Sequence, residues 1–189
     1  MGQLILVRHG QTNWDVESRV QGVLDIPLNA DGTKEAQNIS GELSKSKIHA
    51  VYSAPASCCF ATACEIAFPH KVKVKKVDEF NEVNDGVWQG LLVKDVKKRY
   101  KKQYSSWKTS PVSGRPPGGE SIREAYDRVI RAVHKIVDKH RDENICIVSG
   151  DMTLSIIKCH FKNLNIEEIR KFAPKKIWWE TLELKTNHE

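Results

Sequence analysis

Two short apolar runs, far apart in this chain, are each followed directly by residues that can carry chemistry. Residues 4–7 (LILV) precede the tripeptide RHG at 8–10, and residues 145–148 (ICIV) precede SGD at 149–151. Continuous apolar runs of this length are typical of strands that are buried on both faces of a mostly parallel sheet. Because ligands bind beyond the carboxyl ends of such strands, we expect both tripeptides to line one crevice.

The rest of the chain alternates between strand and helix patterns. We expect further strands at residues 50–53, 72–77 and 178–184, and helices at residues 31–43, 57–68, 93–100 and 121–140. The last helix has the clearest pattern, because Ile122, Val129 and Ile136 share one face behind Ser121, which is a favoured N-cap residue type. This alternation predicts the α/β class, as a three-layer sandwich with a mostly parallel central sheet flanked by helices.

Length and composition fit a single domain over residues 1–189, with 40% hydrophobic and 29% charged residues. A chain of this length buries roughly 70% of its unfolded surface. Its net charge is +6, but acidic and basic residues are interleaved along most of the sequence. The densest basic segment, KDVKKRYKKQY at 94–104, is either a polyanion contact or an exposed amphipathic helix. We favour the helix, and we expect no nucleic-acid partner.

The five cysteines do not form the pattern of a secreted disulfide scaffold, because their number is odd and Cys58 and Cys59 are adjacent. The chain shows neither a basic leader before a long apolar segment nor a run near the roughly 18 apolar residues of a membrane span. We therefore expect a soluble, cytoplasmic protein with no membrane partner.

Several motifs resemble the histidine phosphatase superfamily, the phosphoglycerate mutase-like group. The most specific is VRHGQTNW at residues 7–14, followed by RVQG at 19–22. Three later segments extend the resemblance, namely DIPLNADG at 25–32, FNEVNDGVWQG at 80–90 and GGES at 118–121. The resemblance implies a phosphoglycerate mutase-like fold that uses neither a metal nor another cofactor, and the sequence shows no His/Cys/Asp cluster at metal-ligand spacing.

The resemblance also implies roles for individual residues. His9 matches the nucleophile, Arg8 matches the first phosphate clamp, and Glu82 matches the proton donor. Gln21 and Gly22 match substrate-binding positions. A phosphohistidine reaction needs this set, because it requires a neutral imidazole nitrogen aimed at phosphorus, cationic donors on the phosphoryl oxygens and an acid at the leaving oxygen.

Three substrate-binding positions depart from the family pattern. Cys58 stands where ungapped alignment after YSAP (52–55) places a second arginine, Gly150 stands where the second histidine belongs, and Asp15 replaces an asparagine. Asp151 adds another carboxylate beside the missing histidine. Losing one transition-state donor costs on the order of a hundredfold to a thousandfold in rate. A carboxylate about 4 Å from a phosphate oxygen adds repulsion of about 4 kcal/mol at an effective dielectric near 20.

Two alternatives would weaken the conclusion that the pocket has lost phosphate-binding groups. An alignment slip would let His49, His70 or His160 supply the missing histidine. Cys58, at the start of a predicted helix, would otherwise be an activated nucleophile. We favour a small buried residue at position 58.

Two functions are therefore compatible with the sequence. The favoured one is a noncatalytic or weakly active subunit of a phosphoserine phosphatase, dimeric with an intact histidine phosphatase homologue and acting on a small phosphorylated metabolite. The alternative is a slow, cofactor-independent phosphomonoesterase that uses His9 and Glu82. GVWQGLLV at 86–93 resembles the metal-independent phosphoserine phosphatase branch, although α-ribazole and broad acid phosphatases share much of it. Trp178 and Trp179 mark an edge strand that either pairs with the partner or packs under the last helix.

Overall fold

A single five-stranded sheet forms the centre of the molecule, with the strand order β3-β2-β4-β1-β5. The computed structural model describes residues 2–173 and 177–184. The strands are β1 (Gln3–Arg8), β2 (Ala50–Ser53), β3 (Val74–Lys76), β4 (Ile145–Ser149) and β5 (Trp179–Glu183). The first four are parallel, whereas β5 runs antiparallel to β1. All five predicted strands are present, and the one predicted at 72–77 is shorter than expected.

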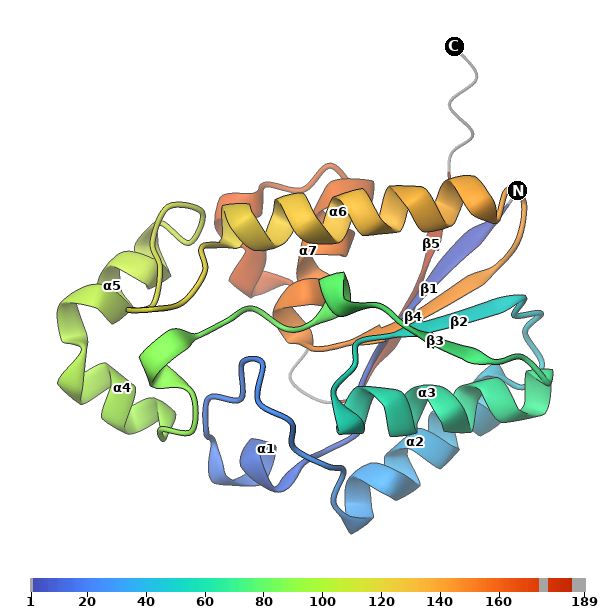
Figure 1. Cartoon of the computed structure of the whole chain (residues 1–189), viewed down its shortest axis with the longest axis horizontal. Coiled ribbons are helices and arrows are strands. Elements are labelled where there is room, and N and C mark those ends of the chain that lie inside the picture. Colours follow the sequence, from blue (N-terminus) through green and yellow to red (C-terminus); the bar gives the residue numbers. More distant parts are fainter. Residues whose placement is uncertain (1, 174–176, 185–189) are drawn as a thin grey trace.

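The helices are α1 (Asn13–Glu17), α2 (Ala30–Leu43), α3 (Ser57–His70), α4 (Val93–Arg99), α5 (Lys101–Thr109), α6 (Ile122–Lys139) and α7 (Asp151–Phe161). The longer helices α2, α3, α6 and α7 lie on the two faces of this sheet, whereas α1, α4 and α5 lie beyond the ends of its strands (Figure 1). Figure 1 shows α2 and α3 on one face and α6 and α7 on the other. This arrangement confirms the predicted three-layer α/β sandwich. In the described part of the chain, no helix has the length and apolar character required to span a membrane.

The register of the sheet brings the two chemistry-bearing tripeptides side by side. Leu4 pairs with Ile145 and Arg8 pairs with Ser149 in the parallel β1–β4 ladder. The His9 amide continues the ladder by donating to the Ser149 carbonyl at 3.3 Å. Both strands are almost wholly buried, which explains their continuous apolar sequences.

The start of α6 shows why its sequence predicted a helix so clearly. Ser121 Oγ accepts from the Glu124 amide at 3.3 Å, and the Glu124 carboxylate accepts from the Ser121 amide at 2.8 Å. This capping box satisfies amides that would otherwise lack partners in the first turn. The predicted apolar face, Ile122, Val129 and Ile136, is buried in the core.

A small aromatic cluster packs outside the main core, beside the pocket described below. Trp88 and Trp107 meet edge to face with ring centroids 5.5 Å apart, and Tyr100 and Tyr104 pack against them. Because Val96 of α4 and Tyr104 and Trp107 of α5 pack into this cluster, the basic segment 94–104 belongs to amphipathic helices, as favoured from the sequence. The Val20 amide donates to the Leu91 carbonyl at 2.9 Å and so ties this cluster to the pocket wall.

Candidate active site

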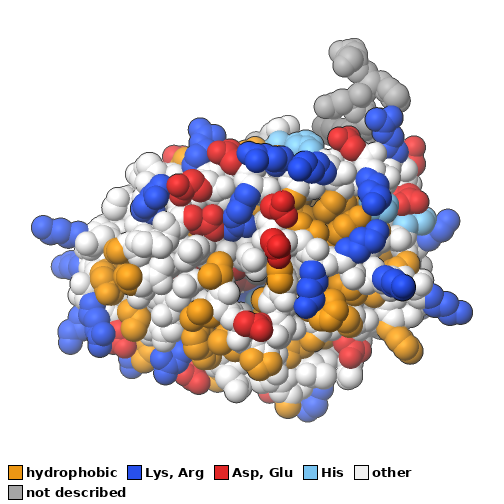
Figure 2. All heavy atoms as spheres, viewed as in Figure 1, with side chains coloured by type: hydrophobic (Ala, Val, Ile, Leu, Met, Phe, Trp, Pro, Cys, Tyr) orange, Lys and Arg blue, Asp and Glu red, His pale blue; other side chains and the backbone are white. Residues whose placement is uncertain are grey.

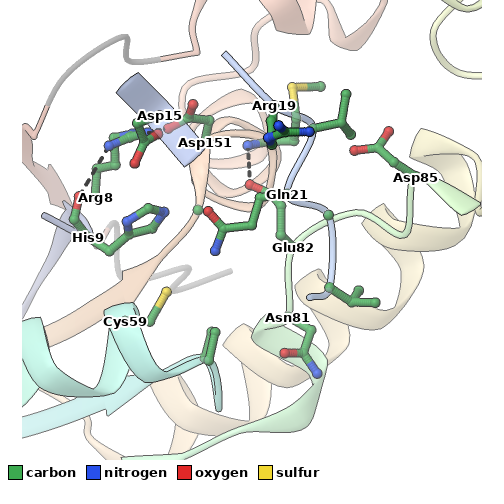
Figure 3. A pocket seen from close by; sticks show the side chains of 17 residues that line it. Arg8, His9, Asp15, Arg19, Gln21, Cys59, Asn81, Glu82, Asp85 and Asp151 are labelled. Carbon is green, nitrogen blue, oxygen red and sulfur yellow. Dashed lines mark hydrogen bonds and ion pairs between the residues drawn. The ribbon is translucent and has the colours of Figure 1, made fainter. Parts of the chain in front are cut away.

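A pocket opens where β1 and β4 end, as the two tripeptides predicted. It is hollowed into the face shown in Figure 2, and Figure 3 shows its lining side chains. Seven of the eight predicted site residues line it, and these are Arg8, His9, Asp15, Gln21, Gly22, Glu82 and Gly150. The lining also contains residues that the sequence reasoning did not select, among them Arg19, Cys59, Asp85 and Asp151. Six formally charged side chains therefore surround the pocket, four of them carboxylates.

His9 is held in one orientation at the end of β1. Its Nδ1 lies 2.8 Å from the Gly10 carbonyl oxygen, so Nδ1 is the donor and Nε2 is left for other partners. The Gly10 amide is in turn fixed by Thr62 Oγ1 at 3.1 Å. In Figure 3 the imidazole of His9 and the thiol of Cys59 face the same part of the pocket. This orientation suits attack by Nε2 on a group in the pocket.

Each of the three guanidinium nitrogens of Arg8 already has a protein acceptor, so at most two of its five N–H groups are left for a ligand. Nε is paired with Asp151, Nη2 donates to Asp15 at 2.7 Å, and Nη1 donates to the His9 carbonyl at 3.2 Å. Burial opposes the charged form, yet the two carboxylates outweigh it and raise the pKa of Arg8. The predicted phosphate clamp is therefore part of an ion-pair cluster.

Asp15 is held by α1 as well as by Arg8. Its carboxylate accepts from the Thr12 amide at 2.7 Å and from the Thr12 hydroxyl at 2.8 Å, which completes a capping box. Burial tends to raise the pKa of Asp15, but Arg8 and the Thr12 hydrogen bonds lower it overall. Asp15 is therefore a fixed negative charge in the pocket wall.

Glu82 occupies the space beside the residue that replaces the second histidine. A Cβ atom on Gly150 would lie 2.3 Å from Glu82 Oε2, so a side chain at position 150 requires Glu82 to move. The Glu82 carboxylate accepts from the amides of Met152 and Thr153 at 2.9 and 3.0 Å. It thereby caps α7, whose own N-cap Gly150 has no side chain to do so. Burial and the Asp151 charge raise the pKa of Glu82, against the lowering effect of these amides.

Cys58, the eighth predicted site residue, is fully buried and lies behind the pocket wall. Its Sγ accepts from Gln21 Nε2 at 3.6 Å and lies 4.0 Å from the Sγ of Cys59. Cys59 lines the pocket instead. Its position next to the predicted site residue Cys58 was the sequence feature that could have identified it. We find no support for a pocket-lining nucleophile at position 58, and the preferred interpretation, a small buried helix residue, agrees with the structure.

The pKa values of His9, Cys58 and Cys59 are shifted in different directions, so the three side chains differ in how readily they hold a proton. The hydrogen bond with Cys59 lowers the pKa of Cys58 despite burial, and His9 and Gln21 lower it further. The same bond and burial raise the pKa of Cys59. Burial lowers the pKa of His9, but the neighbouring Cys58 raises it overall. The arrangement favours a Cys58 thiolate beside a His9 imidazolium, and a protonated Nε2 has no lone pair with which to attack phosphorus.

Asp85 is a pocket carboxylate with an unusual environment. Its Oδ1 is buried without a hydrogen-bond partner. Burial, together with Glu82, raises its pKa to about 7, while Arg170 acts in the opposite direction. The sequence placed Asp85 within a matching segment but offered no sign that it would be buried.

The three histidines considered as substitutes lie elsewhere. His49 Nδ1 accepts from the Asn144 amide at 2.9 Å, before β4 begins, and His160 Nδ1 lies 2.6 Å from the Tyr126 hydroxyl. His70 is the last residue of α3. His9 is the histidine that lines the pocket, so an alignment slip does not restore the missing group.

The family model described as "Histidine phosphatase superfamily (branch 1)" matches residues 4–189. The chain belongs to this superfamily. Phosphoserine phosphatase 1 of Hydrogenobacter thermophilus is 31% identical over 173 residues, which cover 92% of this chain and 82% of that relative. The metal-independent phosphoserine phosphatase of Arabidopsis thaliana is 33% identical over 158 residues, covering 82% of this chain and 66% of the relative.

The fold of this histidine phosphatase is also that of solved structures. Bacillus stearothermophilus YhfR superposes with a TM-score of 0.89 at 24% sequence identity, over 98% of this chain and 93% of that one. The predicted phosphoglycerate mutase-like architecture is thus confirmed. In the pocket of this member, Arg8 is paired with two carboxylates and Arg19 with Glu17.

Proposed function

We propose that this histidine phosphatase is a noncatalytic or weakly active subunit of a phosphoserine phosphatase, paired with an intact homologue in the cytoplasm. The complete enzyme would hydrolyse L-phosphoserine to L-serine and phosphate. The substrate class is supported by the similarity to relatives named as phosphoserine phosphatases and by the segment 86–93. The noncatalytic or weakly active role is supported by the ion pairs and charges in the pocket of this chain.

The engagement of Arg8 is the observation that carries this proposal. A phosphoryl dianion needs free guanidinium donors, and here each nitrogen of Arg8 has a protein acceptor. Each charge-assisted hydrogen bond that is unavailable costs about 1.5–3 kcal/mol of binding or transition-state stabilisation. Cys58 and Gly150 leave two further donor positions empty of cationic or imidazole groups. Asp15 and Asp151 repel the anion instead.

A slow phosphomonoesterase remains the second candidate, because the orientation of His9 is intact. In that reaction Nε2 forms a bond to phosphorus while the bond from phosphorus to the ester oxygen breaks. Glu82, when protonated, donates its proton to the departing alkoxide, and water then hydrolyses the phosphohistidine. Both Glu82 oxygens accept hydrogen bonds from α7, which makes this donor poorly placed in the resting state.

Activity assays on the purified chain distinguish the two candidates. We would measure turnover of phosphoserine and of an aryl phosphate, alone and with an intact homologue from the same source, beside His9→Ala. The subunit proposal expects little turnover alone and a mixed complex in native mass spectrometry. Turnover equal to that of intact relatives, abolished by His9→Ala, would reject it in favour of the phosphomonoesterase.

A variant that returns altered positions to the family pattern tests whether the charge of the pocket causes the low activity. Cys58→Arg combined with Gly150→His and Asp151→Ala restores two phosphate-binding groups and removes one opposing charge. We expect turnover to rise by at least about a hundredfold, the lower end for one restored donor. The matched control is Cys64→Arg, at an exposed position of the same helix α3. A folded triple variant with unchanged turnover would show that pocket charge is not the cause.

A further inference from the structure

His9, Cys58 and Cys59 form a compact group of buried donor atoms at the pocket wall, which His9 and Cys59 line and behind which Cys58 lies. One ring nitrogen and the two sulfur atoms all lie within 4.8 Å of one another. The exposed fractions of these residues are 6%, 0% and 3%. Spacing along the sequence predicted no such cluster, because His9 follows β1 whereas the cysteines lie in the first turn of α3. The structure corrects that expectation.

We infer that this group is a binding site for a single zinc-like d10 metal ion, with His9 Nε2, Cys58 Sγ and Cys59 Sγ as its protein ligands. Zinc prefers nitrogen and sulfur donors in tetrahedral geometry, in which bond lengths near 2.0 and 2.3 Å place neighbouring donors about 3.5–3.8 Å apart. The two sulfur atoms are already 4.0 Å apart. Small side-chain rotations bring all three donors to an ion between them.

The surrounding hydrogen bonds orient the donors as a metal site requires. His9 Nδ1 donates to the Gly10 carbonyl, so Nε2 is the nitrogen that binds a metal once the ion has displaced its proton. A histidine ligand is commonly fixed in this way through its other nitrogen. Gln21 donates to the Cys58 sulfur and stabilises negative charge there. These contacts hold two ligands in place before an ion arrives.

The charge of the pocket favours a cation over an anion. Its lining contains the carboxylates of Asp15, Glu82, Asp85 and Asp151, while both lining arginines are paired with carboxylates. The same field that opposes a phosphoryl dianion attracts a divalent cation. Because His9 and Cys59 face the open pocket, water or another small ligand can complete the fourth position.

Metal binding and phosphohistidine formation exclude each other at this site. Both require the same lone pair on His9 Nε2. A bound ion therefore abolishes any residual attack on phosphate esters, whichever of the two proposed functions holds. The replacement of an arginine by Cys58 would then have changed the pocket from an anion site to a cation site.

Direct binding measurements test the site without relying on activity. The reduced, metal-free protein is titrated with Co2+, whose thiolate charge-transfer absorption reports sulfur ligation, and Zn2+ is then used to displace it. We expect one ion per chain by native mass spectrometry, and affinity at least about a hundredfold lower in Cys58→Ser, Cys59→Ser and His9→Gln. Cys64→Ser, at an exposed cysteine of α3, is the control and should bind as the parent does.

Thermal unfolding with and without Zn2+ provides the second readout. An ion that binds the native state raises the unfolding midpoint of the parent protein and of Cys64→Ser, but not of the three ligand variants. Sub-stoichiometric binding, binding that survives loss of both cysteines, or Co2+ spectra without thiolate absorption would overturn the assignment.

Discussion

Asp151 holds Arg8 by Nε, on one edge of the guanidinium group that the resemblance assigns to phosphate. Asp15 holds Nη2 from another side, and the side chain of Arg8 is only 7% exposed. The arginine is thus buried, while the side chains of Asp15 and Asp151 are 25% and 34% exposed, and a phosphate ester competes with these carboxylates for the arginine. On the proposed function, this relationship is the reason why the pocket keeps the RHG tripeptide and yet binds phosphate weakly.

Releasing Arg8 should restore anion binding. In Asp151→Asn the Nε donor loses its charged acceptor, and one repulsive charge disappears from the pocket. We expect the affinity for inorganic phosphate to rise about tenfold to a hundredfold, equivalent to one charge-assisted hydrogen bond. Isothermal titration calorimetry measures this change. Asp138→Asn, on the exposed face of α6, is the matched control, and equal affinities in both variants would contradict the explanation.

Glu82 and position 150 should be energetically coupled. Gly150→Ala places a Cβ against Glu82 Oε2, so it should lower the free energy of unfolding by about 1–3 kcal/mol, in the range for overpacking. In a Glu82→Ala background the obstruction is gone, and the same substitution should cost less. Urea unfolding of the four proteins gives the coupling energy.

Gly41→Ala is the control for this cycle. Gly41 lies within α2, and a Cβ there meets nothing within 4 Å. The substitution should raise the free energy of unfolding by about 0.5–1 kcal/mol, because alanine favours helix. Additive effects of the Gly150 and Glu82 substitutions would show that the two positions do not compete for space.

Arg128 should be the anchor that positions Glu82. From α6 it donates to the carbonyls of Glu79 and Asn81 at 2.6 and 2.9 Å, and it pairs with Glu120. Arg128→Ala removes these bonds, and we expect the free energy of unfolding to fall by about 2–4 kcal/mol, as for a buried charged network. Chemical denaturation checks this.

The matched control is Arg131→Ala, at an exposed position of the same helix. Its effect should stay within about 0.5 kcal/mol, as is usual for surface substitutions. Comparable losses in the two variants would mean that the carbonyl partners of Arg128 add nothing beyond what an exposed arginine of the same helix contributes.

Asp85 should make stability fall as pH rises. Its pKa is about 7 in the folded protein against an ordinary value of 3.8, with burial as the main cause. Between these values the folded state binds more protons than the unfolded state, so deprotonation of the unfolded chain progressively favours unfolding. Asp85→Asn should flatten this part of the stability profile and give a relative gain near neutral pH.

Urea unfolding across this pH window measures the effect. Asp138→Asn, at an exposed position of α6, again serves as the control. A profile in Asp85→Asn that parallels the parent would show that Asp85 is ionised in the native state throughout the window.

The edge strand β5 should contribute to pairing with a partner chain. Strand β5 is at the edge of the sheet, Trp178 and Trp179 are both partly buried, and Trp179 Nε1 donates to Glu42 of α2 at 2.7 Å. Trp179→Lys removes an aromatic anchor and adds a charge, so the mixed or homodimeric assembly should dissociate at least about tenfold more readily. Native mass spectrometry after dilution checks this, and an unchanged assembly mass would remove β5 as the pairing surface.

Local sequence patterns were sufficient to predict most of the elements of this fold. The apolar runs at 4–7 and 145–148 identify buried strands, and Ser121 with its capping partner Glu124 begins α6, because these signals act over a few residues. The short helix α1 was not predicted, since five residues carry too little periodicity to recognise, and neither α5 nor α7 was among the predicted helices. The predicted end of α3 at residue 68 fell short, because the helix continues through Pro69 to His70.

The sequence by itself determined the α/β layering, the superfamily resemblance and the identity of the altered positions. Only the tertiary structure decided what those alterations do. Arg8 meets Asp151 across 143 residues of chain, and Thr153 meets Glu82 across 71. Such pairings depend on parallel register and on the direction of each side chain, neither of which is encoded in local periodicity. The charge state of the pocket is thus a property of the folded chain.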